Sequence, residues 1–284
     1  VQAYVQILIE ILGAIGDSDN DSEVVYPLFA RNIDKLDDIF AKVLRYRATN
    51  TFNRVKANEA ESIATGIFYF GNQILEFPLG NKASNMEIAI ASNVTVLKIF
   101  TQQAFPKQWA QTHNNLGNAY SDRIVSNKAE NIEQAIKAYT EALKVFTRQA
   151  FPEDWAKTQN NLGIAYCKRM MGDRAQNIEE AIKAFNLTLE IFTYQAFAYQ
   201  WATQQHNLGN AYLYRILGDR EQNIEQAIQI FNRALEIVTR PAFSNEGAMI
   251  KNALGGAYIK RMIGDKADNI KDAIATYKAV LEIY

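Results

Sequence analysis

Cys167, His113 and His206 are the residues best suited to nucleophilic or acid–base chemistry, because the sequence holds one cysteine and two histidines. A nucleophilic thiol needs an imidazole within hydrogen-bond distance to activate it. A single cysteine excludes an internal disulfide and a cysteine-rich zinc site, and two histidines leave few ligands for a metal. The sequence therefore predicts no metal, no cofactor and no catalytic site, unless the fold brings Cys167 to a histidine.

Composition and charge narrow the class of protein further. The chain has 284 residues, of which 48 % are apolar, and a formal net charge of −1. Such a chain is too apolar and too weakly charged to be disordered. Its 30 basic and 31 acidic residues are interspersed, whereas nucleic-acid binding needs basic residues clustered on one face. We expect a protein that binds no nucleic acid.

The dominant feature of the sequence is a repeat of 46 residues, found by looking for internal similarity first. Leu-Gly recurs at this step from Leu116-Gly117 to Leu254-Gly255, and a fainter copy includes Gly71 and Asn85. The same step relates four phenylalanines, Phe105, Phe151, Phe197 and Phe243, and four arginines, Arg123, Arg169, Arg215 and Arg261. We predict N-terminal capping helices over residues 1–58 and five repeats over 59–104, 105–150, 151–196, 197–242 and 243–284, the last of them truncated.

Each repeat is predicted to contain two helices. Phe105-Pro106 opens the first helix of its repeat, since proline is tolerated in a first turn. Asn131 is predicted to cap the second helix, with Gln134 completing a capping box. Gly172 is expected to end a first helix through a left-handed conformation. Because neither helix can bury its apolar face alone, successive pairs should stack into an all-α solenoid of about 12 helices.

The repeat register separates Cys167 from the histidines. Cys167 and His206 fall on the first helices of neighbouring repeats, seven residues apart in register. That offset corresponds to about 10 Å of helix rise, in addition to about 9 Å between helix axes. His113 is replaced by Gln159, Gln205 and Lys251 in the other repeats, so nothing at that position requires an imidazole. We therefore interpret both histidines as structural or solvated, and the protein as non-catalytic.

The repeated arginines have two interpretations. They could form an anion-binding row, or each could form an ion pair with a carboxylate such as Glu133, Glu179 or Glu225 and cap terminal carbonyls. Recurrence in every repeat favours the structural interpretation.

These motifs resemble the tetratricopeptide repeat (TPR) family. Its Leu-Gly-x-x-Tyr and Ala-x-x-x-Phe patterns occur as Leu162-Gly163-x-x-Tyr166 and Ala181-x-x-x-Phe185. The family's usual unit has about 34 residues, so the longer repeat implies longer helices. The resemblance implies a right-handed solenoid of antiparallel helix pairs, whose first helices line a concave groove that binds peptides.

A closer resemblance is to the long TPR arrays of cyanobacterial proteins that often carry a C-terminal caspase-like CHAT domain. The phrases that carry it are residues 151–163, 218–225, 25–28 and 32–38. The CHAT domain is absent from this sequence, so its protease activity does not transfer to these residues. An alternative function is therefore the regulatory or sensor half of a larger CHAT protease.

The polar face of the first helices is the predicted binding site. Asn114, Asn160 and Asn252 recur at one position, and asparagine can both donate to and accept from a peptide backbone. The alternative is a merely solvated face. The residues assigned to the groove are Gln111, Asn114, Asn115, Asn118, Lys157, Asn160, Asn161, Ile164, Lys168, His206, Asn207, Asn210, Leu213, Tyr214, Asn252 and Lys260.

The N-terminal segment is less regular. Helices are predicted over Val1–Ile15 and about Asn32–Thr49, the second burying Ile33, Leu36, Ile39, Phe40, Val43 and Leu44. Both should cap the first repeat, although Val1–Ile15 could instead support self-assembly into a homo-oligomer. The acidic run Asp17–Glu23 is expected to be a solvated loop, because it lacks the glycine and glutamate positions of a calcium-binding loop.

No stretch is apolar enough to cross a membrane, and low cysteine use fits the cytoplasm. The chain begins at Val1, which suggests a processed or truncated form, and we expect the native protein to continue beyond Tyr284.

Overall fold

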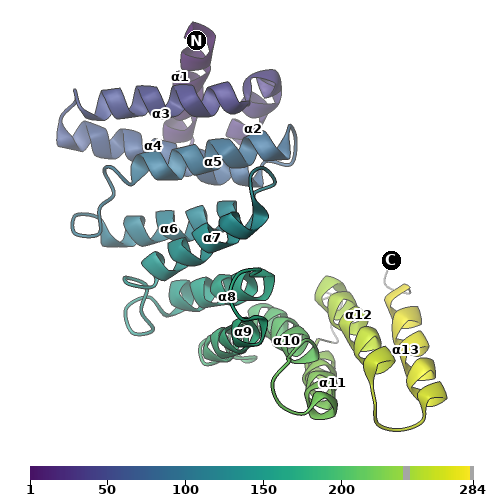
Figure 1. Cartoon of the computed structure of the whole chain (residues 1–284). Helices are drawn as coiled ribbons and strands as arrows, with labels where there is room; N and C mark the ends of the chain where they lie inside the picture. Colours follow the sequence, from purple (N-terminus) through teal and green to yellow (C-terminus); the bar gives the residue numbers. More distant parts are fainter. Residues whose placement is uncertain (239–243, 282–284) are drawn as a thin grey trace. The chain divides into compact units, whose positions relative to one another are not determined.

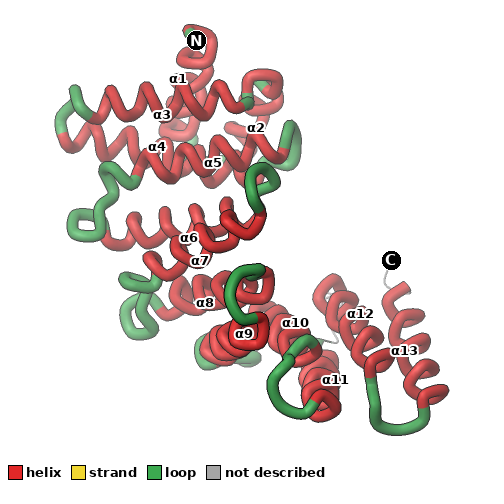
Figure 2. The backbone as a smooth tube through the Cα atoms, viewed as in Figure 1, coloured by secondary structure: helices red, strands yellow, loops and turns green. Residues whose placement is uncertain are grey.

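The computed structural model describes residues 1–238 and 244–281, which form helices joined by loops and turns (Figures 1 and 2). They form thirteen α-helices and one short 3₁₀ helix, with no strand in the described ranges. The predicted all-α class is confirmed, with one helix more than expected. The chain divides into two compact units, Val1–Ala150 and Phe151–Tyr284. Their boundary coincides with a predicted repeat boundary.

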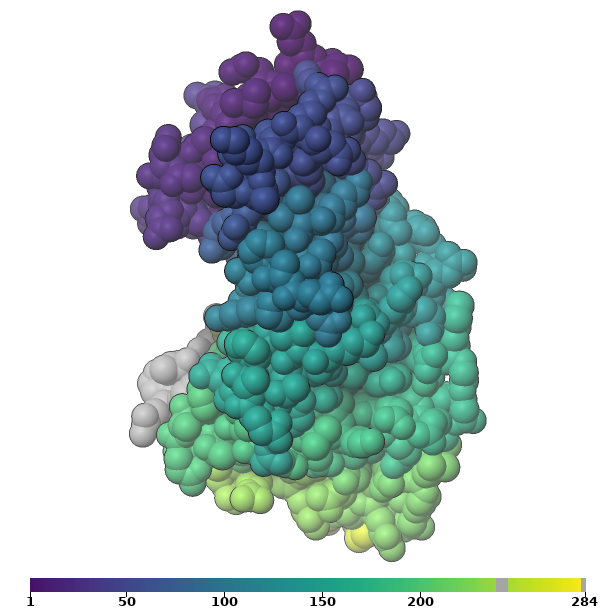
Figure 3. All heavy atoms as spheres, turned by 90° about the vertical axis from the view of Figure 1, so that its left-hand side faces the viewer, coloured from purple at the N-terminus to yellow at the C-terminus, as the bar shows by residue number. Residues whose placement is uncertain are grey.

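In the first unit the helices α4 to α7 each pack on the next, and the colours of this unit pass from purple to teal in the space-filling view (Figure 3). The helix pairs α4·α5 and α6·α7 correspond to the first two predicted repeats. The helices are α1 (Gln2–Asp17), α2 (Ser22–Arg31), the 3₁₀ helix Ile33–Lys35, α3 (Asp38–Phe52), α4 (Ala57–Glu76), α5 (Lys82–Val96), α6 (Pro106–Asp122) and α7 (Lys128–Ala142).

In the second unit three further helix pairs follow one another, and the first helices α10 and α12 also pack on the second helix of the preceding pair. This is the packing expected of a helical repeat. The helices are α8 (Pro152–Lys168), α9 (Arg174–Leu189), α10 (Ala198–Leu213), α11 (Arg220–Ile237), α12 (Ser244–Lys260) and α13 (Lys266–Leu281).

The N-terminal cap contains three helices rather than two. Helix α1 packs on α4 and α3 packs on α5, and Ile7, Ile11 and Ile15 join one apolar core with residues of the first repeat. Helices α1 and α3 therefore pack on the helices of the first repeat. Helix α4 begins at Ala57, so the predicted boundary after residue 58 falls inside a helix.

The predicted helix Asn32–Thr49 is wrong in its start. Asp37 caps α3 by accepting hydrogen bonds from the backbone N–H groups of Ile39 and Phe40, and the chain before it forms the separate helix α2. Leu36, Phe40, Val43 and Leu44 are buried as predicted. Ile33 and Ile39 are exposed instead, and Ile33 lies in the separate 3₁₀ helix before α3.

The predicted loop Asp17–Glu23 is shorter than expected. Helix α1 continues to Asp17 and α2 already begins at Ser22, with Asp21 as its N-cap. The turn between the helices is held by Gln73 of α4, whose amide donates to the backbone oxygen of Asn20 at 2.8 Å and to its side-chain oxygen at 2.6 Å.

Asn131 is not the N-cap of the second helix of its repeat, so this prediction is also wrong. Asn127 is the cap, and α7 begins at Lys128. Asn131 is buried inside the first turn, where its amide donates to the backbone oxygen of Val125 at 2.9 Å. The recurring asparagine therefore fixes the loop before the helix, which a local capping pattern does not reveal.

Gly172 has the predicted left-handed conformation, with φ of 75°, but it does not end the first helix. Helix α8 ends at Lys168, and Gly172 instead directly precedes Asp173, the N-cap of α9. At the equivalent place the second repeat has Ser126, which holds φ of 72° without being glycine.

The glycine of each Leu-Gly, on the first helix of a repeat, lies against an aromatic ring on the second helix of the same repeat. A Cβ added at Gly163 would lie 2.6 Å from Cε1 of Phe185, and one at Gly117 would lie 2.4 Å from the same atom of Tyr139. The absence of a side chain at this glycine therefore leaves the space that the ring occupies.

The Phe and Trp positions contribute to packing to different extents. Phe105 lies edge-on to Phe100 at 5.6 Å between centroids, and Phe197 lies likewise against Phe192 at 5.4 Å. Among the recurring tryptophans Trp201 is buried, whereas Trp109 and Trp155 are half-buried. Phe243 lies outside the described residues.

Candidate functional site: the asparagine face of the first helices

Asparagines of successive first helices hydrogen-bond to one another. In the first unit the amide of Asn115 on α6 donates to the side-chain oxygen of Asn72 on α4 at 2.7 Å. In the second unit Asn207 on α10 donates in the same way to Asn160 on α8 at 2.9 Å. We call the surface that carries such a pair the asparagine face of its unit; it lies on α4 and α6 in the first unit and on α8 and α10 in the second.

Each of these pairs has a further amide beside it. Asn160 donates to the side-chain oxygen of Asn161 at 3.2 Å, so Asn160 takes part in two hydrogen bonds. A primary amide can form about four. Asn160, one residue of the predicted row, is thus connected by hydrogen bonds to Asn161 and Asn207, which fix the orientation of its amide.

His206 belongs to the asparagine face but as a structural residue. Its Nε2 accepts a hydrogen bond from the amide of Asn210 at 3.0 Å, while its Nδ1 is buried without a partner in the described part of the chain. Burial lowers the pKa of His206, which keeps the ring neutral at pH 7. His113 is similar: it lies edge-on to Trp109 at 4.4 Å, and burial lowers its pKa.

Cys167 is held as an unreactive thiol. Burial raises its pKa to about 11, so the thiolate that would act as nucleophile is scarce at neutral pH. The residue lines a cavity of about 300 Å³ with Ile178, Asn210 and Tyr214. Arg174 donates to the backbone oxygen of Cys167 at 2.7 Å, which caps the end of α8.

Leu213 does not lie on the asparagine face, so this site prediction is wrong. It is the last residue of α10 and is buried in the core formed with Ile224 and Ile228 of α11. The next residue, Tyr214, is exposed instead. The ammonium group of Lys260 lies over the Tyr214 ring, 4.3 Å from its centroid. This is a cation–π contact between two predicted site residues.

The other predicted residues differ in accessibility. Asn118 accepts a hydrogen bond from the hydroxyl of Tyr139 at 2.8 Å, and Ile164 packs against the core around Ile178, so both serve the packing of their own repeat. Half-buried residues are Gln111, Asn114, Asn115, Asn118, Asn160, Asn161, Ile164, His206, Asn207 and Asn210; exposed ones are Lys157, Lys168, Tyr214, Asn252 and Lys260.

The recurring arginines form ion pairs, as the structural interpretation predicted. Arg215 donates to both carboxylate oxygens of Glu179, at 2.7 and 2.9 Å, and Arg261 repeats these distances with Glu225. Each partner lies 36 residues earlier, on the second helix of the preceding repeat. The guanidinium carbon of Arg215 also lies 5.6 Å from the centroid of the Tyr212 ring. The pair therefore joins adjacent repeats.

One surface feature was missed by sequence analysis although its signal is periodic. Two consecutive apolar residues follow each recurring arginine, and in the structure all of them are between 40 % and 62 % exposed. They lie in the loops between first and second helices: Ile124-Val125, Met170-Met171, Ile216-Leu217 and Met262-Ile263.

Within the described ranges, no three His, Cys, Asp or Glu side chains gather in a way that could hold a metal ion. The same ranges contain no helix with the length and apolar character required to cross a bilayer.

A family model described as "Bacterial protein of unknown function (DUF937)" matches residues 170–236. The match covers α9, α10 and most of α11, a minor part of the chain, and its description names no activity. A search of curated proteins found no match to the chain. What is established is therefore a helical protein that is similar over these residues to that bacterial family.

Proposed function

We propose that this protein is a non-catalytic scaffold of the TPR type, a right-handed solenoid that binds an extended protein or peptide segment along the asparagine face. The observation that carries the proposal is the hydrogen bond from Asn207 to Asn160 at 2.9 Å. It fixes amide groups of two successive first helices at one level, while each amide keeps further bonding capacity.

Such amides suit a peptide backbone. An extended segment presents N–H and C=O groups in alternation, and an asparagine side chain can satisfy either. Recognition of this kind depends little on the ligand's sequence. Selectivity would then come from the exposed residues beside the amides, such as Tyr214 with its Lys260 contact and Lys157.

The chemistry of the remaining residues supports a non-catalytic role. The thiol of Cys167 has a pKa of about 11, and both histidines are half-buried with pKa values lowered by desolvation. A thiol that stays protonated is a poor nucleophile near pH 7.

The proposal can be tested with peptides selected from a random 12-residue display library on the immobilised chain. We expect Asn160→Ala to weaken the selected peptide about 5- to 150-fold, because the lost amide leaves a backbone group unpaired at a cost of about 1–3 kcal/mol. Lys183→Ala is the matched control, since Lys183 is exposed on α9 and should leave affinity unchanged. Calorimetry measures both variants.

Backbone recognition has its own test. N-methylation of single peptide bonds in the selected ligand removes one N–H donor at a time while its side chains stay the same. We expect at least one methylated ligand to lose affinity as strongly as Asn160→Ala does. Equal affinities for Asn160→Ala and Lys183→Ala, together with full tolerance of methylation, would place the ligand elsewhere and leave the asparagine face as an internal support.

A further inference from the structure

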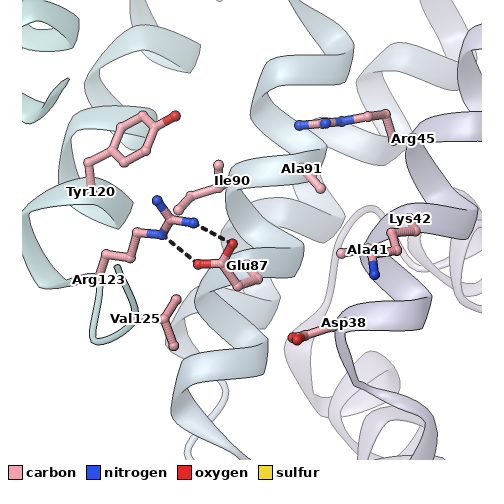
Figure 4. A pocket seen from close by; sticks show the side chains of 10 residues that line it. All are labelled: Asp38, Ala41, Lys42, Arg45, Glu87, Ile90, Ala91, Tyr120, Arg123 and Val125. Atoms are coloured by element: carbon pink, nitrogen blue, oxygen red, sulfur yellow. Dashed lines mark hydrogen bonds and ion pairs between the residues drawn. The ribbon is translucent and has the colours of Figure 1, made fainter. Parts of the chain in front are cut away.

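A second candidate site lies in the first unit, on the side of the second helices. It is a cavity of about 430 Å³ between α3, α5 and the end of α6 (Figure 4). Helix α5 forms its floor through Glu87 and Ile90, which lie on one helix face because they are three residues apart. Lys42 and Arg45 come from α3 on one side, and Tyr120 and Arg123 from α6 and the residue that follows it on the other (Figure 4).

The charges lining this cavity do not cancel. Arg123 forms an ion pair with Glu87, to which it donates two hydrogen bonds of 2.6 and 2.8 Å. Lys42 and Arg45 are exposed, and the side chain of neither makes an ion pair or hydrogen bond with another residue of the described ranges. Asp38 is the other carboxylate in the lining. With Arg123 and Glu87 neutralising each other, two cations and one anion remain, a surplus of one positive charge.

The walls between the charges are apolar or aromatic. Ile90 is buried in the floor, and the half-buried ring of Tyr120 stands beside Arg123, whose guanidinium carbon is 5.9 Å from the ring centroid. A ligand with a charged group next to an apolar side chain would match both parts of the lining. A peptide residue of that kind also fits the volume, since pockets for small ligands begin near about 300 Å³.

This combination does not arise from the 46-residue repeat. Helix α3 precedes the repeats, and its face with Lys42 and Arg45 meets the first of the recurring arginine–glutamate pairs only because α3 packs on α5. The cavity therefore has a composition of its own rather than that of a generic junction between repeats.

We propose that this cavity binds a carboxylate side chain of an acidic peptide segment, with Arg45 as its bidentate partner, Lys42 as a second cation, and the adjoining apolar residue on Ile90 and Tyr120. Planar guanidinium groups pair well with carboxylates. The single surplus charge matches one carboxylate rather than a phosphate dianion. The site is separate from the asparagine face and does not depend on peptide binding there.

The test uses the blocked peptide acetyl-Leu-Phe-Asp-Leu-amide, and the same peptide with Asn in place of Asp. Both are titrated into the full chain and followed by NMR of the arginine side chains. We expect saturable binding of the Asp peptide, a dissociation constant about tenfold higher in Arg45→Gln, and no binding of the Asn peptide. Raising the salt from 50 to 500 mM should weaken the complex.

Arg47→Gln is the matched control. Arg47 lies on the same helix, is exposed and does not line the cavity, so the charge change is the same while the site is intact. We expect its dissociation constant to stay within about twofold of the original chain. Failure of the Asp peptide to bind at millimolar concentration, equal effects of the two variants, or equal binding of the Asn peptide would each overturn the proposal.

Competition identifies the anion. Acetate and inorganic phosphate are compared as displacing agents at pH 7 and equal ionic strength. If the site is built for a carboxylate, acetate should displace the Asp peptide at least as well as phosphate does. Stronger displacement by phosphate would assign the cavity to a phosphoryl group and overturn the carboxylate proposal.

Discussion

Gly209 lies directly against the ring of Phe231, which is fully buried. A Cβ at Gly209 would be 2.4 Å from Cε1 and 2.7 Å from Cζ of that ring, closer than real carbon contacts allow. The same relation joins Gly163 to Phe185 and Gly255 to Tyr277. The glycine of Leu-Gly therefore sets the distance between the two helices of a repeat.

Gly209→Ala should destabilise the fold by about 1–3 kcal/mol, because the methyl group forces a buried ring off its position. Urea unfolding measures the change. Gly13→Ala is the control: Gly13 is in helix α1, is exposed, and has open space where its Cβ would be. There we expect a gain of about 0.5–1 kcal/mol from helix propensity alone. A loss of stability at Gly13 as large as that at Gly209 would contradict the packing argument.

Periodic features of the fold could be predicted because the same motif occurs in several repeats. Leu-Gly and Ala-x-x-x-Phe predicted helix pairs, and the glycine–ring contacts recur with the same 46-residue step. The sequence also predicted that the recurring arginines form ion pairs with glutamates such as Glu179 and Glu225. In the structure Glu179 pairs with Arg215 and Glu225 pairs with Arg261. The separation of 36 residues between each arginine and its glutamate depends on how successive repeats stack, and the sequence of a single repeat does not determine it.

Features that depend on tertiary context could not be predicted locally. Asn131 has the residue type of a helix cap, but Asn127 four residues earlier takes that role while Asn131 holds the loop. Leu213 has the helical phase of a surface residue, yet it is buried because α10 ends there and α11 covers it. The cavity with Lys42 and Arg45 was missed because α3 lies outside the repeat.

Ser126→Gly should stabilise the protein by about 1 kcal/mol. Ser126 holds φ of 72°, where its equivalents Gly172, Gly218 and Gly264 hold 75°, 80° and 81°. A non-glycine residue pays roughly 1–2 kcal/mol for this conformation, part of which is offset by the greater entropy that glycine has when unfolded.

The comparison for this prediction is Ser62→Gly, an exposed position within helix α4. There glycine has no conformational advantage and should cost several tenths of a kcal/mol. Thermal unfolding of both variants gives the comparison. A lower melting temperature for Ser126→Gly would show that the serine side chain contributes more than its backbone strain costs.

Arg215 and Glu179 should be energetically coupled across two repeats. Their side chains are 29 % and 24 % exposed, and the guanidinium donates two hydrogen bonds that a lysine cannot reproduce. We expect Arg215→Lys and Glu179→Gln each to cost about 1–2 kcal/mol and a double-mutant cycle to give a coupling of about 1 kcal/mol.

Arg233→Lys provides the baseline for that cycle. Arg233 is exposed on α11 and makes no ion pair within the described ranges, so its change should stay within about 0.5 kcal/mol. If Arg215→Lys costs no more than Arg233→Lys, the ion pair contributes nothing measurable to joining the repeats.

Stability should fall as the pH drops from 7 toward 5.5, because His113 and His206 are half-buried and desolvation lowers the pKa of each. Unfolded histidine takes up a proton near pH 6.5. Below that pH the unfolded state therefore binds more protons than the folded state, and protonation favours unfolding. Each histidine contributes a slope of at most about 1.4 kcal/mol per pH unit.

Replacing both histidines with the residues found at the equivalent positions of another repeat, as in His113→Gln with His206→Asn, should flatten the pH dependence of stability. Urea unfolding between pH 7 and 5.5, above the range where carboxylates titrate, isolates this effect. An unchanged slope in the double variant would assign the pH dependence to other groups.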